Sequence, residues 1–520
     1  MRRATRTCLF TIARSIAKYA ETDFSRYIPP TRRKYDAVVV GGGHNGLVHA
    51  AYLAKAGLRV LVLERRHLVG GAAVTEELIS GFKFSRGSYL AGLMRPQVVS
   101  DLELKKYGLR YLQRTPSSFT PTLHSGRYLM LGHKDMQDDL ASIAQFSAED
   151  AASYVQYENF MSQVRAILQP LLDMPPIAFP SGHTRWRELV FTFRKTAELF
   201  GLMWKHRDAL VGLFQLLMGP AKTILDQYFN SDILKATLAT DAVIGAVTSP
   251  SSLGSAYVLV HHVMGTVDGR AGVWAYVEGG MGALSEAIAA SARASGAEIV
   301  CNAHVDGLLY NSSDDSRPST TNSAADKRVI GVVVNGTPIE ASVVISAVTP
   351  YMTFLEMGSF SSSSSSSSKA PGTGSASPVA IPSPLPKPFL HHLRHTDYSC
   401  GAMKINLAVN RLPNFSCYPS PADGVPGPMH RGTIHFESSV DELERAYEQA
   451  KAGFTADVPV IEMTIPSALD YTIAPPGQHV VQLFINYAPY DLNPSYEGGW
   501  DNEMVRDAFV RRIYDRFVGH

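Results

Sequence analysis

The sequence predicts an α/β protein in which a Rossmann-like nucleotide-binding domain is joined to a mixed α+β substrate domain. Three observations predict this class. A strand, a glycine loop, a helix and a second strand follow one another near the N-terminus, helical patterns dominate from Ser147 to about Asp241, and short strands return after residue 297. At 520 residues, the chain is long enough for two or three domains.

The first elements form a β-α-β unit. Tyr35 to Val40 are an apolar strand that runs into glycines. A helix is expected from about Asn45 to Ala56, where Gly57 ends it, and Leu58 to Leu63 form the second strand. Because near-continuous apolar strands are typical of parallel sheets covered on both faces, the unit predicts such a sheet.

The loop after the first strand fits the pattern G-x-G-x-x-G on Gly41, Gly43 and Gly46. Gly41 permits the tight turn out of the strand, Gly43 lets the backbone approach a pyrophosphate, and Gly46 lets the helix pack closely on the sheet. The helix start then offers N–H groups and a positive dipole end to phosphates. Glu64 ends the second strand, 18 residues after Gly46, where a carboxylate can accept hydrogen bonds from an adenosine ribose.

The residues after this acid indicate which dinucleotide binds. They read Glu64-Arg65-Arg66-His67-Leu68-Val69-Gly70-Gly71-Ala72-Ala73-Val74-Thr75. Here the chain resembles the phytoene desaturase and amine oxidase superfamily of flavoproteins, in which a basic residue and a glycine doublet follow the acid and lie against the extended cofactor. An ordinary Gly-Gly turn is the alternative interpretation of the doublet.

The resemblance implies flavin adenine dinucleotide (FAD) as the cofactor and a set of residues that bind it. That set is Val40, Gly41, Gly42, Gly43, His44, Asn45, Gly46, Glu64, Arg65, Gly70, Gly71, Ala72 and, from a later strand, Val305. In the family, the backbone of a residue like Val305 lies near the adenine. The fold it implies is an FAD-binding domain of the amine oxidase and phytoene desaturase type.

The resemblance narrows to the branch that contains bacterial phytoene desaturases, and it covers Tyr35 to the end apart from a serine-rich insertion. It continues through Gly81–Arg86, Ser88–Leu90, Arg95-Pro96, Asp101–Leu104, Glu278–Leu284 and Lys404–Leu407. In the family, Gly280-Met281-Gly282 start a helix of the FAD domain. A separate nicotinamide-binding domain is the alternative, which is disfavoured because the next strand has no acid at the ribose position.

Other elements follow from local patterns. A helix is expected over Ser285–Ser295 and a strand over Glu298–Val305. Strands Val329–Val334 and Val343–Ala347 surround an Asn335-Gly336 turn, which is typical of a hairpin. Residues 311–327 are expected to be a flexible loop. The stretch 358–388, with eight consecutive serines, is expected to be disordered because it has little apolar surface to bury.

These patterns predict the domain organisation. A mitochondrial transit peptide (1–34) comes first. The FAD-binding domain consists of two segments (35–120 and 276–357), and the substrate domain consists of a helical segment (121–275) and a later segment (389–520). The disordered insertion (358–388) lies directly before that later segment.

Related flavoproteins end with C-G-S-x-x-H-P-G-G-G against the flavin ring. That segment does not occur before His520, so we expect a truncated isoform, an incomplete gene model or a variant.

The first 34 residues predict the compartment. They hold nine lysines and arginines against Glu21 and Asp23, and Leu9, Ile12, Ile16 and Tyr19 fall on one helical face. This acid-poor amphipathic pattern predicts import into the mitochondrion, with the matrix as destination. A disordered basic tail is the alternative.

Composition excludes several functions. The net charge of +1 and the lack of a basic stripe argue against nucleic acid as a partner. The four cysteines (Cys8, Cys301, Cys400 and Cys417) form no C-x-x-C pair, so dithiol chemistry has no support. The run Leu199 to Met218 is broken by charges and predicts no membrane span, but an amphipathic helix that is buried, lines a substrate tunnel or rests on a membrane.

Catalytic residues stay unknown at this level, with two candidates. Lys404, on the strand Met403–Val409, and Arg86 are candidates to face the flavin or a substrate; an ordinary strand lysine and a structural salt bridge are the alternatives. No metal site is expected. The pairs His261-His262 and His391-His392 are placed on strands, where neighbouring side chains point to opposite faces.

The sequence therefore predicts a mitochondrial FAD-dependent oxidoreductase that transfers hydride on a small, apolar substrate. Two alternatives stay open. One is a non-catalytic regulator that uses the flavin fold as a scaffold for a mitochondrial protein partner, and the other is a redox-neutral polyene isomerase.

Overall fold

A computed structural model describes residues 27–123, 126–174, 186–310, 328–357, 385–420 and 424–518. Residues 1–26 of the expected transit peptide (1–34), the loop 311–327 and residues 358–384 of the serine-rich insertion lie outside the described residues. The chain divides into two compact units. Unit 1 takes its residues from 1–89, 97–110 and 277–398, and unit 2 from 90–96, 111–276 and 399–520.

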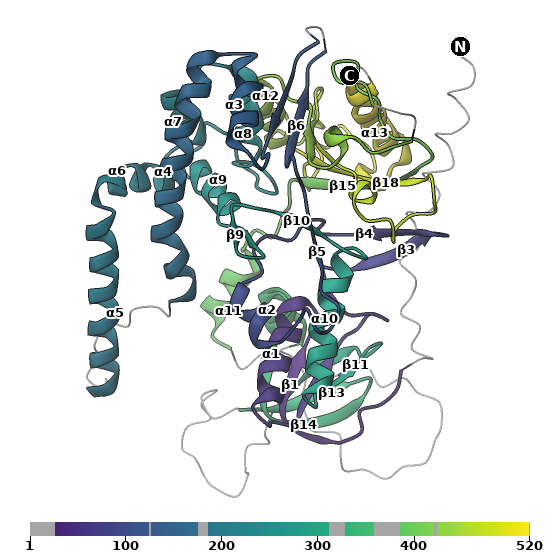
Figure 1. Cartoon of the computed structure of the whole chain (residues 1–520). Helices are drawn as coiled ribbons and strands as arrows, with labels where there is room; N and C mark the ends of the chain where they lie inside the picture. The colour runs from purple at the N-terminus through teal and green to yellow at the C-terminus, as the bar shows by residue number, and fades with distance from the viewer. Residues whose placement is uncertain are drawn as a thin grey trace, which may run out of the picture. The chain divides into compact units, whose positions relative to one another are not determined.

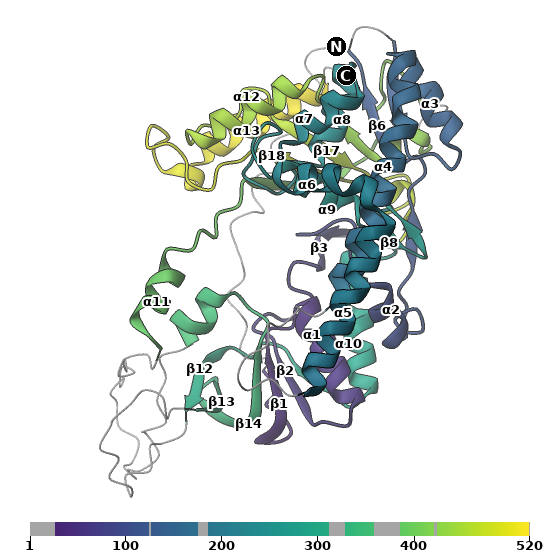
Figure 2. The same ribbon diagram turned by 90° about the vertical axis from the view of Figure 1, so that its left-hand side faces the viewer.

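Unit 1 is built on a six-stranded sheet in the order β11-β2-β1-β14-β13-β12 (Figure 1). Its elements are β1 (Lys34–Val40), α1 (His44–Lys55), β2 (Val60–Leu63), β3 (Thr75–Ile79), β4 (Phe82–Ser85), α2 (Pro96–Asp101), α10 (Met281–Ala294), β11 (Glu298–Val300), β12 (Val305–Tyr310), β13 (Val329–Val334), β14 (Thr337–Ser346), the π-helix η5 (Met352–Glu356) and α11 (Lys387–Arg394). Figure 2 shows β12, β13, β14, β1 and β2 following one another across the sheet.

The sheet of unit 1 combines parallel and antiparallel pairing. β11, β2, β1 and β14 are parallel, and β13 and β12 continue the sheet in antiparallel pairing. The apolar strands β1 and β2 are buried, as their continuous patterns predict. α1 contacts α10, so two helices cover the parallel strands together. This is the α/β Rossmann-like architecture that the sequence predicts.

Unit 2 combines helices with a second six-stranded sheet, in the order β15-β18-β17-β16-β6-β7. Its strands are β5 (Tyr111–Gln113), β6 (Ser118–Pro121), β7 (Tyr128–Leu131), β8 (Thr266–Val267), β9 (Arg270–Ala271), β10 (Ala275–Val277), β15 (Ala402–Val409), β16 (Thr433–His435), β17 (Val460–Thr464) and β18 (His479–Asn486). Its α-helices are α3 (Met136–Ala144), α4 (Ala148–Asp173), α5 (Trp186–Lys205), α6 (Leu210–Met218), α7 (Ala221–Tyr228), α8 (Asp232–Thr240), α9 (Ser255–Val263), α12 (Val440–Lys451) and α13 (Glu503–Val518). Short 3₁₀ turns occur at η3 (Arg207–Ala209), η7 (Pro428–His430), η8 (Pro466–Ala468) and η9 (Gly499–Asp501).

Unit 2 has two apolar cores. One core joins the helices, with Tyr157, Leu225 and Leu259 among its buried residues. The other lies on the sheet and includes Phe509 and Ile513 of α13. Three unit borders fall at 110/111, 276/277 and 398/399, whereas the sequence places domain borders at 120/121, 275/276 and 388/389. Residues 90–96 also belong to unit 2.

Several expected elements differ in the structure. The single strand Glu298–Val305 is wrong: it is split into β11 and β12, because Asn302 has φ +55° and turns the chain from β2 towards β13. The strand expected from Val343 begins at Thr337, and the helix expected from Ser285 begins at Met281. α11 begins at Lys387, inside the expected insertion. The Asn335-Gly336 hairpin is confirmed, with both residues at positive φ.

Both histidine pairs lie on helices, so the expected strands are wrong. His261 and His262 belong to α9, and His391 and His392 to α11. The β-branched sequence around His261 suits a strand locally, but Ala256, Leu259 and Val260 are buried at helical spacing in the core of unit 2. Tertiary packing therefore decides the conformation there.

Candidate nucleotide-binding site

The candidate site lies where the parallel strands of unit 1 end. The register places Val40 of β1 beside Leu63 of β2 and Ser346 of β14, and Leu63 beside Val300 of β11. The Gly41 N–H donates to the Leu63 carbonyl at 2.8 Å, which extends the pairing into the loop. Ligands of open α/β sheets bind at this carboxyl edge.

The three motif glycines have different reasons to be glycine. Gly41 has φ +100°, and a Cβ there would lie 2.9 Å from Val348 Cγ1. A Cβ on Gly46 would lie 2.2 Å from the Gly41 carbonyl oxygen, so only glycine lets α1 start this close to the sheet. At Gly43, the nearest protein atom to such a Cβ would be Gly71 Cα at 4.0 Å. The protein leaves the space above Gly43 open.

The first turn of α1 faces this open space. Gly43 is its N-cap, with φ −68° and ψ 165°, and no described side chain caps the helix. Such a helix start presents backbone N–H groups and a partial positive charge, the combination that binds phosphate. His44 is half-buried, and burial lowers the pKa of its imidazole, which favours the neutral form. Asn45 is exposed.

Glu64 is fixed beside the glycine loop. Its carboxylate is buried, with 8% of the residue exposed. The Gly42 N–H donates to Oε2 at 2.7 Å, and the Arg66 N–H donates to Oε1 at 2.9 Å. Each oxygen keeps a second lone pair, so the oriented carboxylate can still accept hydrogen bonds from ribose hydroxyls.

The glycine doublet lies against the loop, although the two are about 30 residues apart. Gly70 pairs with Gly43 in a parallel bridge, and its N–H donates to the Gly42 carbonyl at 2.8 Å. Gly70 has φ +124° and Gly71 has φ +60°. A Cβ on Gly71 would lie 3.2 Å from Gly43 Cα. The doublet is thus a second wall of the same loop rather than an isolated turn.

The remaining expected cofactor residues surround this centre. Arg65 and Ala72 are exposed, and the Ala72 carbonyl accepts the Ser88 N–H at 3.0 Å. Val305 is buried at the start of β12, directly after the loop in which the Ala303 N–H donates to the Glu64 carbonyl at 2.9 Å. The structure therefore brings the glycine loop, Glu64, the doublet and the approach to Val305 to one edge of one unit.

A feature that sequence reasoning missed is the capping of α10. Ser85 Oγ accepts the Met281 N–H at 3.0 Å, and Thr75 Oγ1 accepts the Gly282 N–H at 2.8 Å. A Cβ on Gly280 would lie 2.4 Å from Thr75 Oγ1. Gly280, directly before α10, thus makes room for the hydroxyl caps. In the sequence, the only sign of this capping is the presence of hydroxyl residues in the β3–β4 hairpin, some 200 residues away from α10.

Arg86 belongs to an ion-pair network of unit 1. Its Nη1 lies 3.1 Å from Glu76 Oε2, and Arg66 Nη2 lies 2.8 Å from the same oxygen. Burial acts to raise the pKa of the Glu76 carboxyl, but hydrogen bonds and charges from both arginines outweigh it and lower the pKa. This geometry gives Arg86 a structural partner.

Lys404 lies on β15 in the sheet of unit 2, where its cross-strand neighbour is Phe484, which in turn pairs with Glu462 of β17. Burial lowers the pKa of the Lys404 ammonium to about 7. A lysine of this kind exchanges protons near neutral pH.

Among the described residues, metal-ligating side chains and thiols form no second site. Among the residues that the structure describes, no group of three or more His, Cys, Asp or Glu side chains is arranged to hold a metal ion. Cys301, Cys400 and Cys417 are free thiols. The described helices include none long and apolar enough to cross a membrane.

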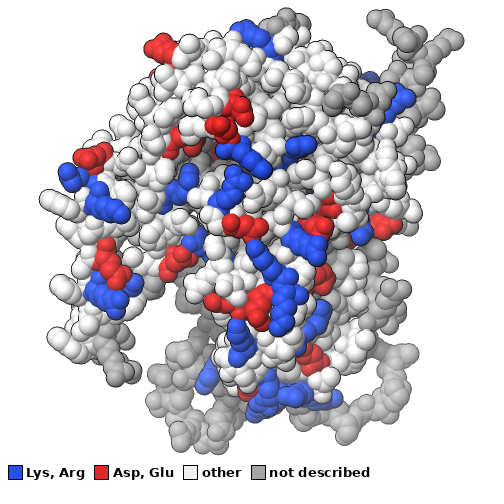
Figure 3. Space-filling model, viewed as in Figure 1, with Lys and Arg blue, Asp and Glu red and all other residues white. Residues whose placement is uncertain are grey.

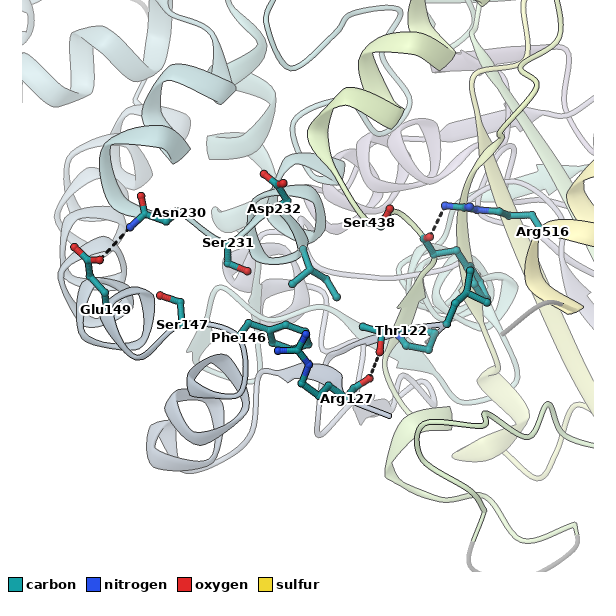
Figure 4. Close-up of a pocket in the computed structure, with 14 residues that line it drawn as sticks. Thr122, Arg127, Phe146, Ser147, Glu149, Asn230, Ser231, Asp232, Ser438 and Arg516 are labelled. Atoms are coloured by element: carbon teal, nitrogen blue, oxygen red, sulfur yellow. Dashed lines mark hydrogen bonds between the residues drawn. The ribbon is translucent and has the colours of Figure 1, made fainter. Parts of the chain in front are cut away.

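Unit 2 contains a cavity of about 740 Å³ (Figure 4). Ser147 before α4 and Ser231 before α8 lie on one side, and Arg516 of α13 lies on the other. Glu149 and Asn230 line the same side as Ser147, where Asn230 Nδ2 donates to Glu149 Oε2 at 3.2 Å. None of the residues predicted to bind a cofactor lines this cavity.

The comparisons with known proteins agree with this geometry. A family model described as an NAD(P)-binding Rossmann-like domain matches residues 39–101, which hold the glycine loop, Glu64 and the doublet. The fold and the site define a nucleotide-binding oxidoreductase.

The chain belongs to the family of pyridine nucleotide-disulfide oxidoreductase domain-containing protein 2. It is 42% identical over 495 residues to that protein of Rattus norvegicus. The matched stretch covers 93% of this chain and 78% of the rat protein. It is also similar to one subunit of the limonene dehydrogenase of Castellaniella defragrans, at 38% identity over 136 residues, 25% of this chain and 24% of that one. The crystal structure of an oxidoreductase from Methanosarcina mazei shares the fold, with a TM-score of 0.51 at 15% identity over 94% of this chain and 84% of that one.

Proposed function

We propose that this chain is an FAD-dependent oxidoreductase of the phytoene desaturase-like branch, which oxidises or reduces a small apolar molecule in the mitochondrial matrix. The observation that carries the cofactor proposal is the space above Gly43. A side chain there would contact only Gly71 Cα, at 4.0 Å, so packing within the protein does not require glycine at this position. A pyrophosphate that approaches the backbone does require it.

The chain's own residues would hold the cofactor at defined points. Glu64, oriented by the Gly42 and Arg66 N–H groups, would accept the ribose hydroxyls, and the first turn of α1 would bind the pyrophosphate. The Gly70-Gly71 doublet supports FAD over a nicotinamide dinucleotide, since it adds a second backbone wall beside the loop. When bound, FAD supplies the hydride-transfer chemistry.

Lys404 is our candidate for moving a proton. Its burial favours the neutral amine, and a neutral amine near pH 7 can accept a proton that leaves the substrate. Arg86 is the less favoured candidate, because Glu76 already holds it.

Two observations support the substrate and the compartment. Limonene, after which the Castellaniella relative is named, is an apolar hydrocarbon, and we infer a substrate of similar polarity. The basic, acid-poor stretch before residue 35 supports mitochondrial import.

The test of the cofactor is a titration of the purified full chain with FAD and, separately, with NAD⁺ and NADP⁺. We expect FAD to bind with a perturbed flavin absorbance spectrum, and Glu64→Ala to weaken it. Binding of NAD⁺ in preference to FAD would contradict the proposal.

A second experiment separates catalysis from a scaffold role. Anaerobic photoreduction of the bound flavin, followed by reoxidation with a polyene or terpene acceptor, should reduce that acceptor and raise its mass by two hydrogens. A product of unchanged mass would favour an isomerase. A flavin that photoreduces but that no acceptor reoxidises would favour the regulator.

A further inference from the structure

The helix α5 of unit 2 differs from the other helices around it. It is 20 residues long, yet none of its residues with a described side-chain environment is fully buried. In Figure 1 it stands at the left edge, and Figure 2 shows it in front. A helix draws most of its stability from packing an apolar face, so an amphipathic helix without a buried residue calls for another surface to cover that face.

The outward residues of α5 form one aromatic stripe. Trp186, Phe193, Phe200 and Trp204 are spaced by seven, seven and four residues, which places them on one face of a helix. Their exposed fractions are 77%, 78%, 71% and 71%. Four large aromatic side chains so exposed in one row exceed the scattered apolar residues that soluble surfaces normally carry.

Two basic side chains, Arg194 and Lys205, lie on one side of this stripe, and a third, Lys195, lies on the opposite face of the helix. From Leu189 to Lys205 the helix carries Arg194, Lys195 and Lys205 against a single acid, Glu198. Arg194 Nε and Lys195 Nζ lie 3.0 Å and 2.7 Å from the Glu198 carboxylate, which pairs with both. Because one acid faces three cations, the net charge of this stretch is positive. Along this region of the molecule in Figure 3, uncharged atoms project outward and the charged atoms occur in small groups.

The next helix continues the exposed apolar surface. In α6, Val211, Phe214 and Met218 are exposed at helical spacing, while Leu213 and Leu216 are buried in the core of unit 2. One face of α6 thus packs on the core of unit 2, and the opposite, apolar face is exposed to solvent.

We propose that the α5 aromatic stripe docks this protein on an anionic phospholipid surface, with the helix lying in the interface. An interfacial helix combines Trp and Phe on one side with Lys and Arg beside them, and it is too polar overall to span the bilayer. Tryptophan favours the boundary between headgroups and acyl chains, and here it stands at both ends of the stripe. Long basic side chains reach from such a helix to lipid phosphates. The net positive charge of α5 favours an anionic lipid surface over a second copy, because two copies of the helix would bring like charges together across a dimer.

Vesicle flotation of the full chain tests the proposal. One set of vesicles is phosphatidylcholine alone, and the other is phosphatidylcholine mixed with cardiolipin. We expect binding to the anionic vesicles that weakens with added salt, together with a blue shift of tryptophan fluorescence.

The decisive variant is Phe193→Ser with Phe200→Ser. We expect its partitioning to fall by about tenfold or more, because each phenylalanine contributes apolar burial in the interface. The matched control is Tyr471→Ser with Tyr490→Ser, two aromatics of unit 2 that are 79% and 65% exposed but lie outside α5 and α6. The control should bind as the parent chain does.

Two results would overturn the proposal. One is unchanged vesicle binding by the Phe193→Ser, Phe200→Ser variant, with its circular dichroism intact. The other is a dimer of the parent chain in sedimentation that this variant converts to a monomer without any effect of lipid, since the stripe would then be an interface between copies.

Discussion

The chain begins two helices of unit 1 after closely spaced glycines, and the two helix starts differ in what meets their first N–H groups. Before α10, the hydroxyl oxygens of Thr75 and Ser85 accept these N–H groups, and Gly280 and Gly282 make room for them. Before α1, no described side chain caps the helix, and the space above Gly43 is open. Buried helix ends require a partner for these groups. The comparison therefore shows that the protein supplies the partner at α10, whereas at α1 it leaves these N–H groups accessible to solvent or to a ligand.

The largest effect is expected from Gly282→Ala. The new Cβ would lie 2.6 Å from Thr75 N and 2.9 Å from Thr75 Cβ, and this backbone cannot give way cheaply. Unfolding in urea should show a loss of about 2–3 kcal/mol. Gly201→Ala is the control, since it lies in helix α5 with no atom within 4 Å of its Cβ. If both variants lost the same free energy of unfolding, the contact of the Gly282 position with Thr75 would not be the cause.

Gly43→Ala should act on the ligand instead. Its backbone, at φ −68°, suits alanine, and its Cβ contacts only Gly71 Cα at 4.0 Å. The free energy of unfolding without FAD should change by no more than about 0.5 kcal/mol. Affinity for FAD, measured by titration calorimetry, should fall about tenfold or more, because a methyl group then separates backbone and phosphate. A variant that binds FAD normally would show that the open space is not used.

Thr75→Val removes one cap of α10 while keeping the side-chain shape. The Gly282 N–H loses its acceptor, which should cost about 1 kcal/mol in urea unfolding and leave FAD affinity unchanged. Thr196→Val is the control, because that hydroxyl bonds only within its own helix, to the Thr192 carbonyl. If FAD affinity fell in step with stability, the two helix starts would not be independent.

The smallest effect concerns pH at the start of α1. Burial lowers the pKa of His44 in the folded chain below its ordinary 6.5. Below pH 6.5 the unfolded chain then binds more protons than the folded one, so stability falls as pH falls through that range. His44→Gln should reduce this slope, as read from urea unfolding at several pH values. If the pH dependence of the free energy of unfolding did not change in this variant, a group other than His44 would be responsible for it.

Much of the fold and of the site could be predicted because the signals are local. The apolar strands, the glycine spacing and Glu64 lie within about 40 residues, and their roles follow from backbone geometry. Predictions were wrong where distant packing decides. His261 lies on a helix because the core of unit 2 buries Ala256 and Leu259. The strand expected from Glu298 is interrupted at Asn302, because its first part pairs with β2 and its second part with β13. That Arg86 or Lys404 faces the flavin or a substrate stays a prediction.

The sequence by itself determined that this protein has a nucleotide-binding loop, since a glycine pattern after a strand specifies its own turn and helix start. Only the tertiary structure decided which of the two glycine-led helices is open. Thr75 and Ser85, which close α10, are separated from it by 207 and 196 residues, and no local pattern connects them. Helix ends are satisfied by whichever polar groups the fold brings near, and that proximity is a property of packing.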